Sequence, residues 1–511
     1  DPKTDQKLRR VSDILPWSTF LIATVELCER FAYYGLSGPF QNYIANSYHD
    51  PNGLPGAIGL DQSGATALTN FFQFWCYVTP ILGAIVADQY LGKYRTIVIF
   101  SIVYATGVFI LFLTSLPWSV EHGYALTGLV VAMIVIGLGT GGIKSNVSPL
   151  IAEQYKATGP FVKTLRTGER VIVDPDLTVQ RIYMVFYMCI NIGSLAPVAT
   201  TLLERNVGFW SAFLVPLIVF LAGFSVLVGG RKKYIVSPPT GSIITHCFKA
   251  LWIACKNGGN LTAAKPSYQA QNGRKEKTPW EDKFIDELRR AVQACKVFAF
   301  YPIYWVCFNQ MLNNFISQAG QMELHGIPND IMQNLDPLTV ILTIPLLDRL
   351  LYPLLRSYSI PLPRPLLITL GFLLASASML HAALLQRHIY HSPPCYTSPS
   401  SCAAALIPPS NTNPNPTYRP NSVHIALQAP AYILIGFSEI FASVTGLEYA
   451  FLHAPPQMKS LVMSLFLLTS AGGAVLGAAV APWARDPHLV GVYGGLAAVC
   501  GGAGVVFWLC F

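Results

Sequence analysis

The sequence predicts an all-α membrane protein with twelve transmembrane helices in two six-helix bundles. Of its 511 residues, 52% are hydrophobic and 12% are charged, which is about half the charged share of a soluble protein. Several stretches, such as Gln62–Ala87 and Leu489–Phe511, contain no Asp, Glu, Lys or Arg. Each exceeds the roughly 20 apolar residues that a helix needs to cross a bilayer. A polar, basic stretch near the middle of the chain separates these runs into two sets.

Adding the apolar runs that hold one ionisable residue or a short charged cluster gives the twelve expected spans. Each is long enough to cross the hydrocarbon core, with some tilt where it is longer. We expect them at residues 17–45, 64–90, 95–116, 124–152, 181–203, 208–229, 295–318, 334–356, 364–386, 423–451, 460–483 and 489–511.

The placement of the basic residues predicts the orientation. With twelve spans and a cytosolic N-terminal segment at 1–16, 28 of the 34 Lys and Arg residues lie on the inner side. This is the asymmetry of the positive-inside rule. The net charge of +8 therefore serves insertion and contact with anionic lipids, and it does not indicate nucleic acid as a partner. The basic residues expected in outside loops are Arg205, Arg387, Arg419 and Arg485.

The chain is expected to divide at the polar stretch after the sixth span. We expect a six-helix bundle at 17–230, a cytosolic linker at 231–294 and a second bundle at 295–511, with an outside loop at 388–422. The linker contains two segments with apolar residues at helical spacing, which predicts amphipathic helices. They are "IITHCFKALWIACKNGG" and "PWEDKFIDELRRAVQACK". Two bundles joined in this way are the layout of the major facilitator fold, in which substrate binds near the midplane between the halves.

The inner loop after the second span supports this layout. Major facilitators place a Gly-x-x-x-Asp-x-x-x-Gly-Arg/Lys-like element there, and "GAIVADQYLGKYR" resembles it. Small residues allow close helix packing, and an aspartate can cap a neighbouring helix end. We therefore assign Asp88, Lys93 and Arg95 to gating and structure.

Two further motifs are interpreted structurally. "GLGTGG" at Gly137–Gly142 matches a nucleotide-binding pattern, but it lies in an apolar span without a preceding strand, so we expect it to serve helix packing. Cys395 and Cys402 lie in the Pro/Ser-rich outside loop. That compartment is oxidising, which makes them candidates for a loop-closing disulfide. Metal-ligand spacing is absent, and we expect neither a metal nor another cofactor.

Five ionisable residues lie at membrane depth: Glu26, Glu29, Arg30, Lys144 and Glu439. A charge at mid-span costs on the order of 2.5–3.5 kcal/mol on insertion scales, so each requires compensation or a function. Glu26 and Arg30 are spaced i,i+4 and can neutralise each other. With Glu29, Tyr33 and Tyr34 they fall within an arc of roughly 140° on the first helix. One interpretation is a static ion-pair network that holds helices together.

The distribution over both halves favours a binding site. Cations on one side of a cavity and a carboxylate on the other suit a zwitterion, with Arg30 and Lys144 for its carboxylate and Glu439 for its ammonium. Buried carboxylates also have pKa values that environment can shift, which makes them candidate proton carriers.

Here a family resemblance becomes specific. "ELCERFAYYG" resembles the E-x-x-E-R-F-x-Y-Y-G motif of the proton-coupled oligopeptide transporter family, called POT or PTR. Further segments that resemble family motifs, in order along the chain, are "GLGTGGIKSNVSPLIAEQY", "FYMCINIGSL", "PIYWVCFNQM" and "SEIFASVTGLEYAFLHAPPQMKS". The resemblance extends from about Leu15 to Ala484 and is strongest to the fungal branch.

The resemblance implies roles for individual residues. Glu26, Glu29, Arg30 and Lys144 correspond to the proton-coupling cluster, and Arg30 and Lys144 also to the residues that hold the peptide carboxylate. Asn191 and Glu439 correspond to the residues that hold the peptide amino terminus. Plain packing remains an alternative for Tyr33 and Trp305. Interhelical hydrogen bonding remains one for Asn191, and a purely structural pair for Glu439. The other implied pocket positions are Tyr33, Tyr34, Tyr77, Trp305 and Ser443.

Four positions depart from family patterns. Asn70 stands where animal relatives have a histidine, so protons are not expected to enter through a histidine there. Asp336 replaces a common asparagine near the amino-terminus pocket, where it adds negative charge or titrates. Asn309 replaces an acidic residue of some bacterial members, which removes an ion pair with Lys144. Phe466 replaces a tryptophan common in bacterial pockets.

The resemblance implies a proton-coupled symporter, not an enzyme, that imports di- and tripeptides by alternating access. Its partners would be peptides, protons and the lipid bilayer, and it would act as a monomer in the plasma membrane. A transporter of nitrate or another organic anion on the same fold remains an alternative, disfavoured by Glu439 and Asp336. A peptide-sensing transceptor with little flux and an uncoupled facilitator are further alternatives.

Overall fold

The structure is a computed structural model of the chain. It describes residues 8–50, 53–155, 159–164, 168–239, 241, 243–271, 278–347, 350, 354, 358, 363–399, 402–408, 417–453, 455 and 458–511. Most of the inner part of the span predicted at 334–356, and part of the loop predicted at 388–422, lie outside these residues.

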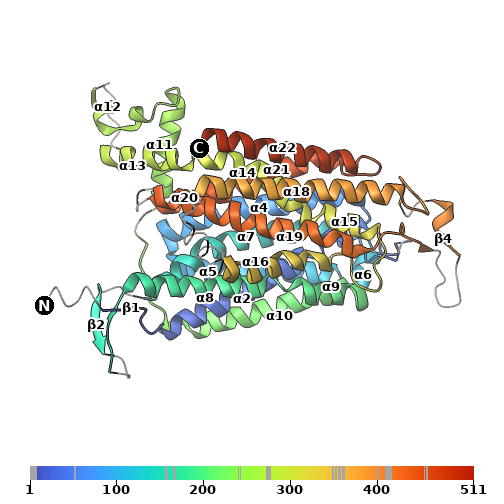
Figure 1. Cartoon of the computed structure of the whole chain (residues 1–511). Helices are drawn as coiled ribbons and strands as arrows, with labels where there is room; N and C mark the ends of the chain where they lie inside the picture. Colours follow the sequence, from blue (N-terminus) through green and yellow to red (C-terminus); the bar gives the residue numbers. More distant parts are fainter. Residues whose placement is uncertain are drawn as a thin grey trace.

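The first half of the chain forms long apolar helices that run side by side (Figure 1). The helices are α2 (Trp17–Ser37), α3 (Phe40–Ala45), α4 (Asp61–Val86), α5 (Lys93–Thr114), α6 (Pro117–Glu121), α7 (Ala125–Ala152), α8 (Pro175–Gly193), α9 (Pro197–Asn206) and α10 (Phe209–Gly229).

The linker and the second half continue the helical architecture. The linker helices are α11 (Ile243–Lys256), α12 (Pro266–Gln271) and α13 (Asp282–Ala294). The second half contains α14 (Tyr301–Asn309), α15 (Asn314–Gly320), α16 (Leu335–Leu346), α18 (Arg364–His391), α19 (Ala429–Ser438), α20 (Thr445–His453), α21 (Lys459–Val480) and α22 (Leu489–Cys510).

Twelve membrane-crossing segments emerge from these helices. Ten helical segments of the described residues are long and apolar enough to cross a bilayer. Two further segments complete the set of twelve. The helix α2 is long enough but contains three charged residues, and the apolar segment Ile331–Leu346 is shorter than the other ten. The strand β1 (Arg10–Val11), the C-terminal residue Phe511 and the linker helices lie at one end of the molecule, and β4 (Leu406–Ile407) lies at the other (Figure 1). We call these the inner and outer ends.

Several predicted spans are interrupted rather than continuous. The helix predicted at 17–45 is interrupted at Gly38 and Pro39, because Pro39 has no N–H for a continuing helix. The span at 181–203 is replaced by α8 and α9, which begins at Pro197. A Cβ on Gly38 would lie 3.1 Å from Pro197 Cβ, so the two breaks pack against each other.

Two separate hydrophobic cores divide the helices. One consists of residues from Ile22 to Tyr234, and the other of residues from Cys295 to Phe507. A third, smaller cluster joins α11 and α13 to Met458 and Leu461 at the start of α21. The amphipathic linker helices thus bury their apolar faces against the second half.

Small residues bring α4 and α7 into close contact. An added Cβ on Gly83 would lie 2.3 Å from the carbonyl oxygen of Gly141. A Cβ on Gly142 would lie 2.0 Å from Phe100, and one on Gly139 2.6 Å from Tyr104. The "GLGTGG" motif therefore serves helix packing, as predicted.

Short strands occur at both ends of the molecule and were not predicted. At the inner end, β1 (Arg10–Val11) pairs in parallel with β3 (Arg170–Val173), which pairs antiparallel with β2 (Phe161–Thr164). At the outer end, β4 (Leu406–Ile407) pairs antiparallel with β5 (Thr417–Tyr418). Cys395 and Cys402 form a disulfide beside β4, with their Cα atoms 5.5 Å apart.

Candidate functional site

A buried charged cluster occupies the middle of α2. Glu26, Glu29 and Arg30 are 4%, 1% and 5% exposed. Arg30 Nε lies 3.3 Å from Glu26 Oε1, and the Arg30 guanidinium also pairs with Glu29. The i,i+4 spacing places the first pair on one helix face. One guanidinium thus serves two carboxylates, and Glu29 Oε1 lacks a hydrogen-bond partner among the described residues.

Lys144 supplies a second cation on α7. Its ammonium lies 3.7 Å from the centre of the Tyr77 ring on α4, which is a cation–π contact. Lys144 is half-buried and is one of the charges that act on Glu26. The carboxylates and cations of the first bundle therefore form one electrostatic group.

Aromatic residues separate this charged group from a cavity between the bundles. The Arg30 guanidinium carbon lies 5.3 Å from the centre of the Tyr33 ring, and Tyr33 donates a hydrogen bond to Gln73 Oε1 at 3.1 Å. Tyr33, Tyr34 and Tyr77 all line the cavity. The charged group thus lies directly behind the tyrosine wall.

The cavity encloses about 110 Å³ and receives residues from both bundles. The first bundle contributes the three tyrosines, Gln73 and the α8 residues Tyr187 and Asn191. The second contributes, among others, Trp305, Asn309, Gln333, Asp336, Glu439 and Ser470.

Two carboxylates mark the side of the cavity formed by the second bundle. Asp336 lies in the first turn of α16, and its Oδ1 has no hydrogen-bond partner among the described residues. Glu439 begins the π-helical segment Glu439–Val444. Such segments place one extra residue in a turn and are frequent at functional sites. Asp336 and Glu439 lie close enough to act on each other electrostatically.

The other predicted pocket residues differ in their placement. Trp305 lines the cavity and donates from Nε1 to Thr469 Oγ1 at 3.0 Å. Asn191 also lines it, with its amide bonded to the Tyr187 carbonyl at 2.8 Å. Ser443 and Phe466 are not part of the lining. Phe466 lies behind Trp305, packed against Phe298 and Tyr301, so its contact with a ligand is not supported by this geometry.

The residues assigned to gating lie at the inner end. Asp88 belongs to the π-helical segment Ala87–Leu91, and its carbonyl accepts from Gly241 N–H at 3.0 Å. Lys93 pairs with Glu153 at the end of α7, which ties α5 to α7. Arg95 is exposed in the first turn of α5. These contacts fit a structural role at the inner end, within the first bundle for Lys93 and between that bundle and the linker for Asp88.

Hydrogen bonds between the bundles close the cavity toward the outer end. Gln41 Nε2 donates to Ser317 Oγ at 2.9 Å, and Gln62 Nε2 to Asn314 Oδ1 at 3.0 Å. Asn42 and Asn329 donate to each other's side-chain oxygens, both at 2.8 Å. Sequence reasoning missed these residues because amides near helix ends resemble ordinary solvated positions. They describe a state whose outer entrance is shut.

The described residues offer no cluster of three or more His, Cys, Asp or Glu placed to hold a metal ion. The side chains that line the cavity and those behind it can form ion pairs, hydrogen bonds and cation–π contacts, and the carboxylates can take up protons. These act on charged, hydrogen-bonding ligands.

Comparison with known proteins places this architecture in a family. The model of the POT family matches residues 94–496. The peptide transporter PTR_A of Candidozyma auris is 50% identical over 506 residues, which are 99% of this chain and 83% of that protein. The peptide transporter PTR2 of Saccharomyces cerevisiae is 47% identical over 507 residues, 99% of this chain and 80% of that protein.

A solved structure shows the same fold. The crystal structure of the POT family transporter PepTSo aligns with a TM-score of 0.75 at 23% identity, over 97% of this chain and 98% of that one. The predicted major facilitator architecture of twelve helices is thereby confirmed. Because the family model covers most of the chain and the curated relatives are about half identical over nearly its full length, the chain belongs to the POT family.

Proposed function

We propose that this protein is a proton-coupled symporter that imports di- and tripeptides by alternating access of its two bundles. Its relatives are named peptide transporters. One observation carries the proposal: Arg30 and Lys144 lie directly behind the tyrosines that line one side of a shared cavity, and Asp336 and Glu439 line its other side.

This polarity matches a molecule with a carboxylate at one end and an ammonium at the other. Arg30 and Lys144 would hold the peptide carboxylate, and Glu439 with Asn191 the amino terminus. Peptides of different sequence share these termini, so two terminal clamps with an aromatic wall between them accept many side chains. The carboxylates Asp336 and Glu439 disfavour nitrate and other small anions.

Proton coupling would reside in the cluster on α2. In this state Arg30 is occupied by Glu26 and Glu29. Protonation of either glutamate weakens its hold on the guanidinium and allows Arg30 to bind a peptide carboxylate. Release to the inner side would accompany loss of that proton. Protons are the coupling ion, and the proposal includes no other cofactor and no enzymatic step.

Transport requires the cavity to change size. At about 110 Å³ it is smaller than the roughly 300–1,000 Å³ of pockets that hold small molecules. Substrate entry from outside would require the Asn42–Asn329 and Gln41–Ser317 contacts to separate as the bundles rock. We propose that the protein works as a monomer in the plasma membrane, with its N-terminus in the cytosol.

Uptake of a labelled dipeptide into proteoliposomes tests the proposal. We expect accumulation above the external concentration with an inward proton gradient, and only equilibration without one. Unlabelled dipeptides should compete and nitrate should not. Competition by nitrate would indicate an anion transporter, equal uptake with and without the gradient a facilitator, and binding without uptake a transceptor.

A further inference from the structure

A carboxyl pair bridges the two bundles at the outer end. Glu204 lies in the last turn of α9, and Asp330 precedes the turn Ile331–Asn334 that leads into α16. Their carboxyl groups are within hydrogen-bonding range of each other. Glu204 is 3% exposed and Asp330 is fully buried. Neither residue lines the central cavity.

The contacts around the pair supply too few donors for two carboxylates. Asn42 Nδ2 donates to Glu204 Oε1 at 2.8 Å. With both groups ionised, Glu204 Oε2 and both Asp330 carboxylate oxygens have no donor among the described residues. Two buried like charges in contact are strongly unfavourable. A single proton shared between the two groups removes one charge and supplies the missing donor.

The remaining charged and titratable groups nearby do not replace that proton. Arg205, the nearest cation, is exposed, and its guanidinium donates to the carbonyl of Ile327. Tyr432 on α19 donates to the carbonyl of Met311 at 3.4 Å. His325 lies 3.5 Å from Glu323 and stacks on His424. Burial raises the pKa of the Asp330 carboxyl to about 7, which is within reach of external pH.

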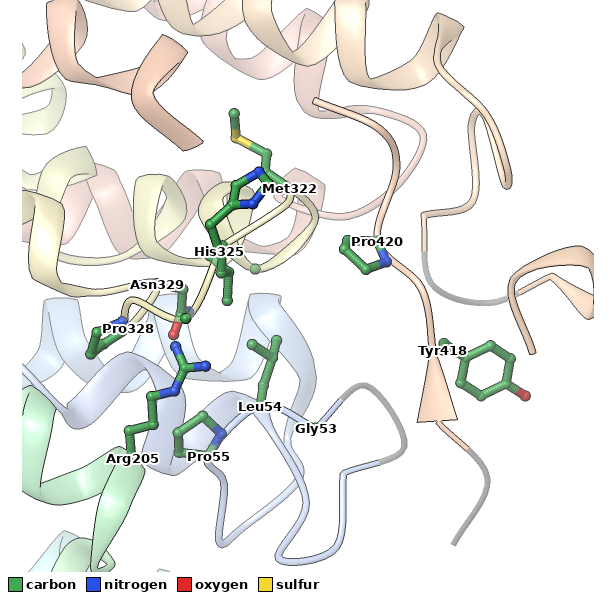
Figure 2. Close-up of a pocket in the computed structure, with 13 residues that line it drawn as sticks. Gly53, Leu54, Pro55, Arg205, Met322, His325, Pro328, Asn329, Tyr418 and Pro420 are labelled. Atoms are coloured by element: carbon green, nitrogen blue, oxygen red, sulfur yellow. The ribbon is translucent and has the colours of Figure 1, made fainter. Parts of the chain in front are cut away.

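An outer vestibule gives external water a route toward the pair. A pocket of about 280 Å³ is lined by Arg205 and Asn329, the sequence neighbours of Glu204 and Asp330. Figure 2 shows Arg205 extending from its helix toward the loop that carries Pro328 and Asn329, with Leu54 and Pro55 beside it. The vestibule therefore reaches the residues next to the pair from the outer end.

We propose that Glu204 and Asp330 form a second proton-binding site, whose bound proton holds the outer entrance shut. Because the pair joins α9 of the first bundle to the α16 segment of the second, its hydrogen bond exists only while the bundles are together. When they separate, both groups face water and ionise. Proton binding therefore favours the closed entrance. The entrance opens more readily as external pH rises from the ordinary pKa of a carboxyl group, about 4, toward the raised pKa of the closed pair, and the effect levels off above it.

The inference rests on the proposed alternation of access and not on the identity of the substrate. Its test is the accessibility of a cysteine placed between the outer hydrogen bonds and the central cavity. Ser37 is buried on α2, one turn beyond Tyr34. In intact cells that carry Ser37→Cys, a membrane-impermeant maleimide added outside reports opening of the entrance. The chain without Ser37→Cys gives the background.

We expect the labelling rate to rise about fivefold or more between external pH 5.5 and 8. Glu204→Gln and Asp330→Asn each place a permanent amide donor in the pair, so both should label slowly at every pH. Glu121→Gln changes an exposed carboxylate near the same end. Its labelling rate should depend on pH as it does in the parent, which is the chain that carries Ser37→Cys alone. Labelling after denaturation gives the amount of each variant in the membrane.

Two results would overturn the inference: labelling of the parent that does not depend on pH, or an unchanged pH dependence in both amide variants. The second result would assign the dependence to Glu26 and Glu29, which the amide variants leave intact. Dipeptide uptake measured in parallel separates the proposals. Failure of uptake with pH-dependent labelling would reject peptide transport and keep the second proton site.

Discussion

Lys144 and Tyr77 are in direct contact, with the ammonium 3.7 Å from the centre of the aromatic ring. Among the described residues Lys144 forms no ion pair, whereas Arg30 is held by two carboxylates. The lysine charge is therefore stabilised by a neutral ring, and it remains available to an incoming carboxylate. In this state it is the more accessible of the two cations.

The first prediction concerns Tyr77. Tyr77→Leu removes the cation–π contact, which is worth about 1–2 kcal/mol in a partly desolvated site, whereas Tyr77→Phe keeps the ring. We expect Leu to weaken dipeptide affinity roughly 5- to 30-fold and Phe to change it little, as measured by competition for uptake. Equal losses in both variants would show that the hydroxyl and not the ring matters.

The second prediction concerns the carboxylates that occupy Arg30. Glu26→Gln and Glu29→Gln each remove a titrating group and leave a side chain of the same shape. We expect accumulation driven by a proton gradient to be lost, while exchange of labelled for unlabelled dipeptide across the membrane persists. Concentrative uptake in both variants would disprove their role in coupling. If only one variant loses it, that glutamate carries the proton.

The charged face of α2 can be predicted from the sequence, because i,i+3 and i,i+4 spacing determines which residues of one helix share a face. The breaks at Pro39 and Pro197 were not predicted, although each proline lacks the N–H that a continuing helix uses. The rotation of each helix about its axis was harder to predict. In an almost uniformly apolar helix such as α21, periodicity does not distinguish the cavity side from the packed side, and Phe466 faces the packed side.

The pair of Glu204 and Asp330 was also beyond sequence reasoning. Glu204 is near the end of an apolar run and Asp330 lies between two of them, where a carboxylate is normally solvated. In the folded chain α9 packs against the segment before α16, and both carboxyl groups are buried. Such a site depends on residues that are 126 positions apart in sequence, and no local pattern indicates it.

The third prediction concerns charge preference in the peptide. Asp336 adds a second carboxylate beside Glu439, so the cavity should favour a substrate that carries an extra positive charge. We expect Asp336→Asn to weaken competition by a dipeptide with an N-terminal lysine about fivefold relative to dialanine, for a loss of roughly 1 kcal/mol in electrostatic energy. The ratio of the two peptides' affinities is an internal control. An equal fold loss of affinity for both peptides would mean that Asp336 acts only on the amino terminus that they share.

The fourth prediction concerns the close contact of α4 and α7. A methyl group on Gly83 would lie 2.3 Å from the carbonyl oxygen of Gly141, and backbone cannot rotate away as a side chain can. We expect Gly83→Ala to cost about 1–3 kcal/mol and to lower the melting temperature of the purified protein. Gly491 on α22 has open space around its Cβ position. Gly491→Ala should therefore leave the melting temperature unchanged or raise it slightly, since alanine favours the helix. A melting temperature that falls equally in both variants would mean that glycine flexibility, and not the close approach of the two helices, determines the stability of the bundle.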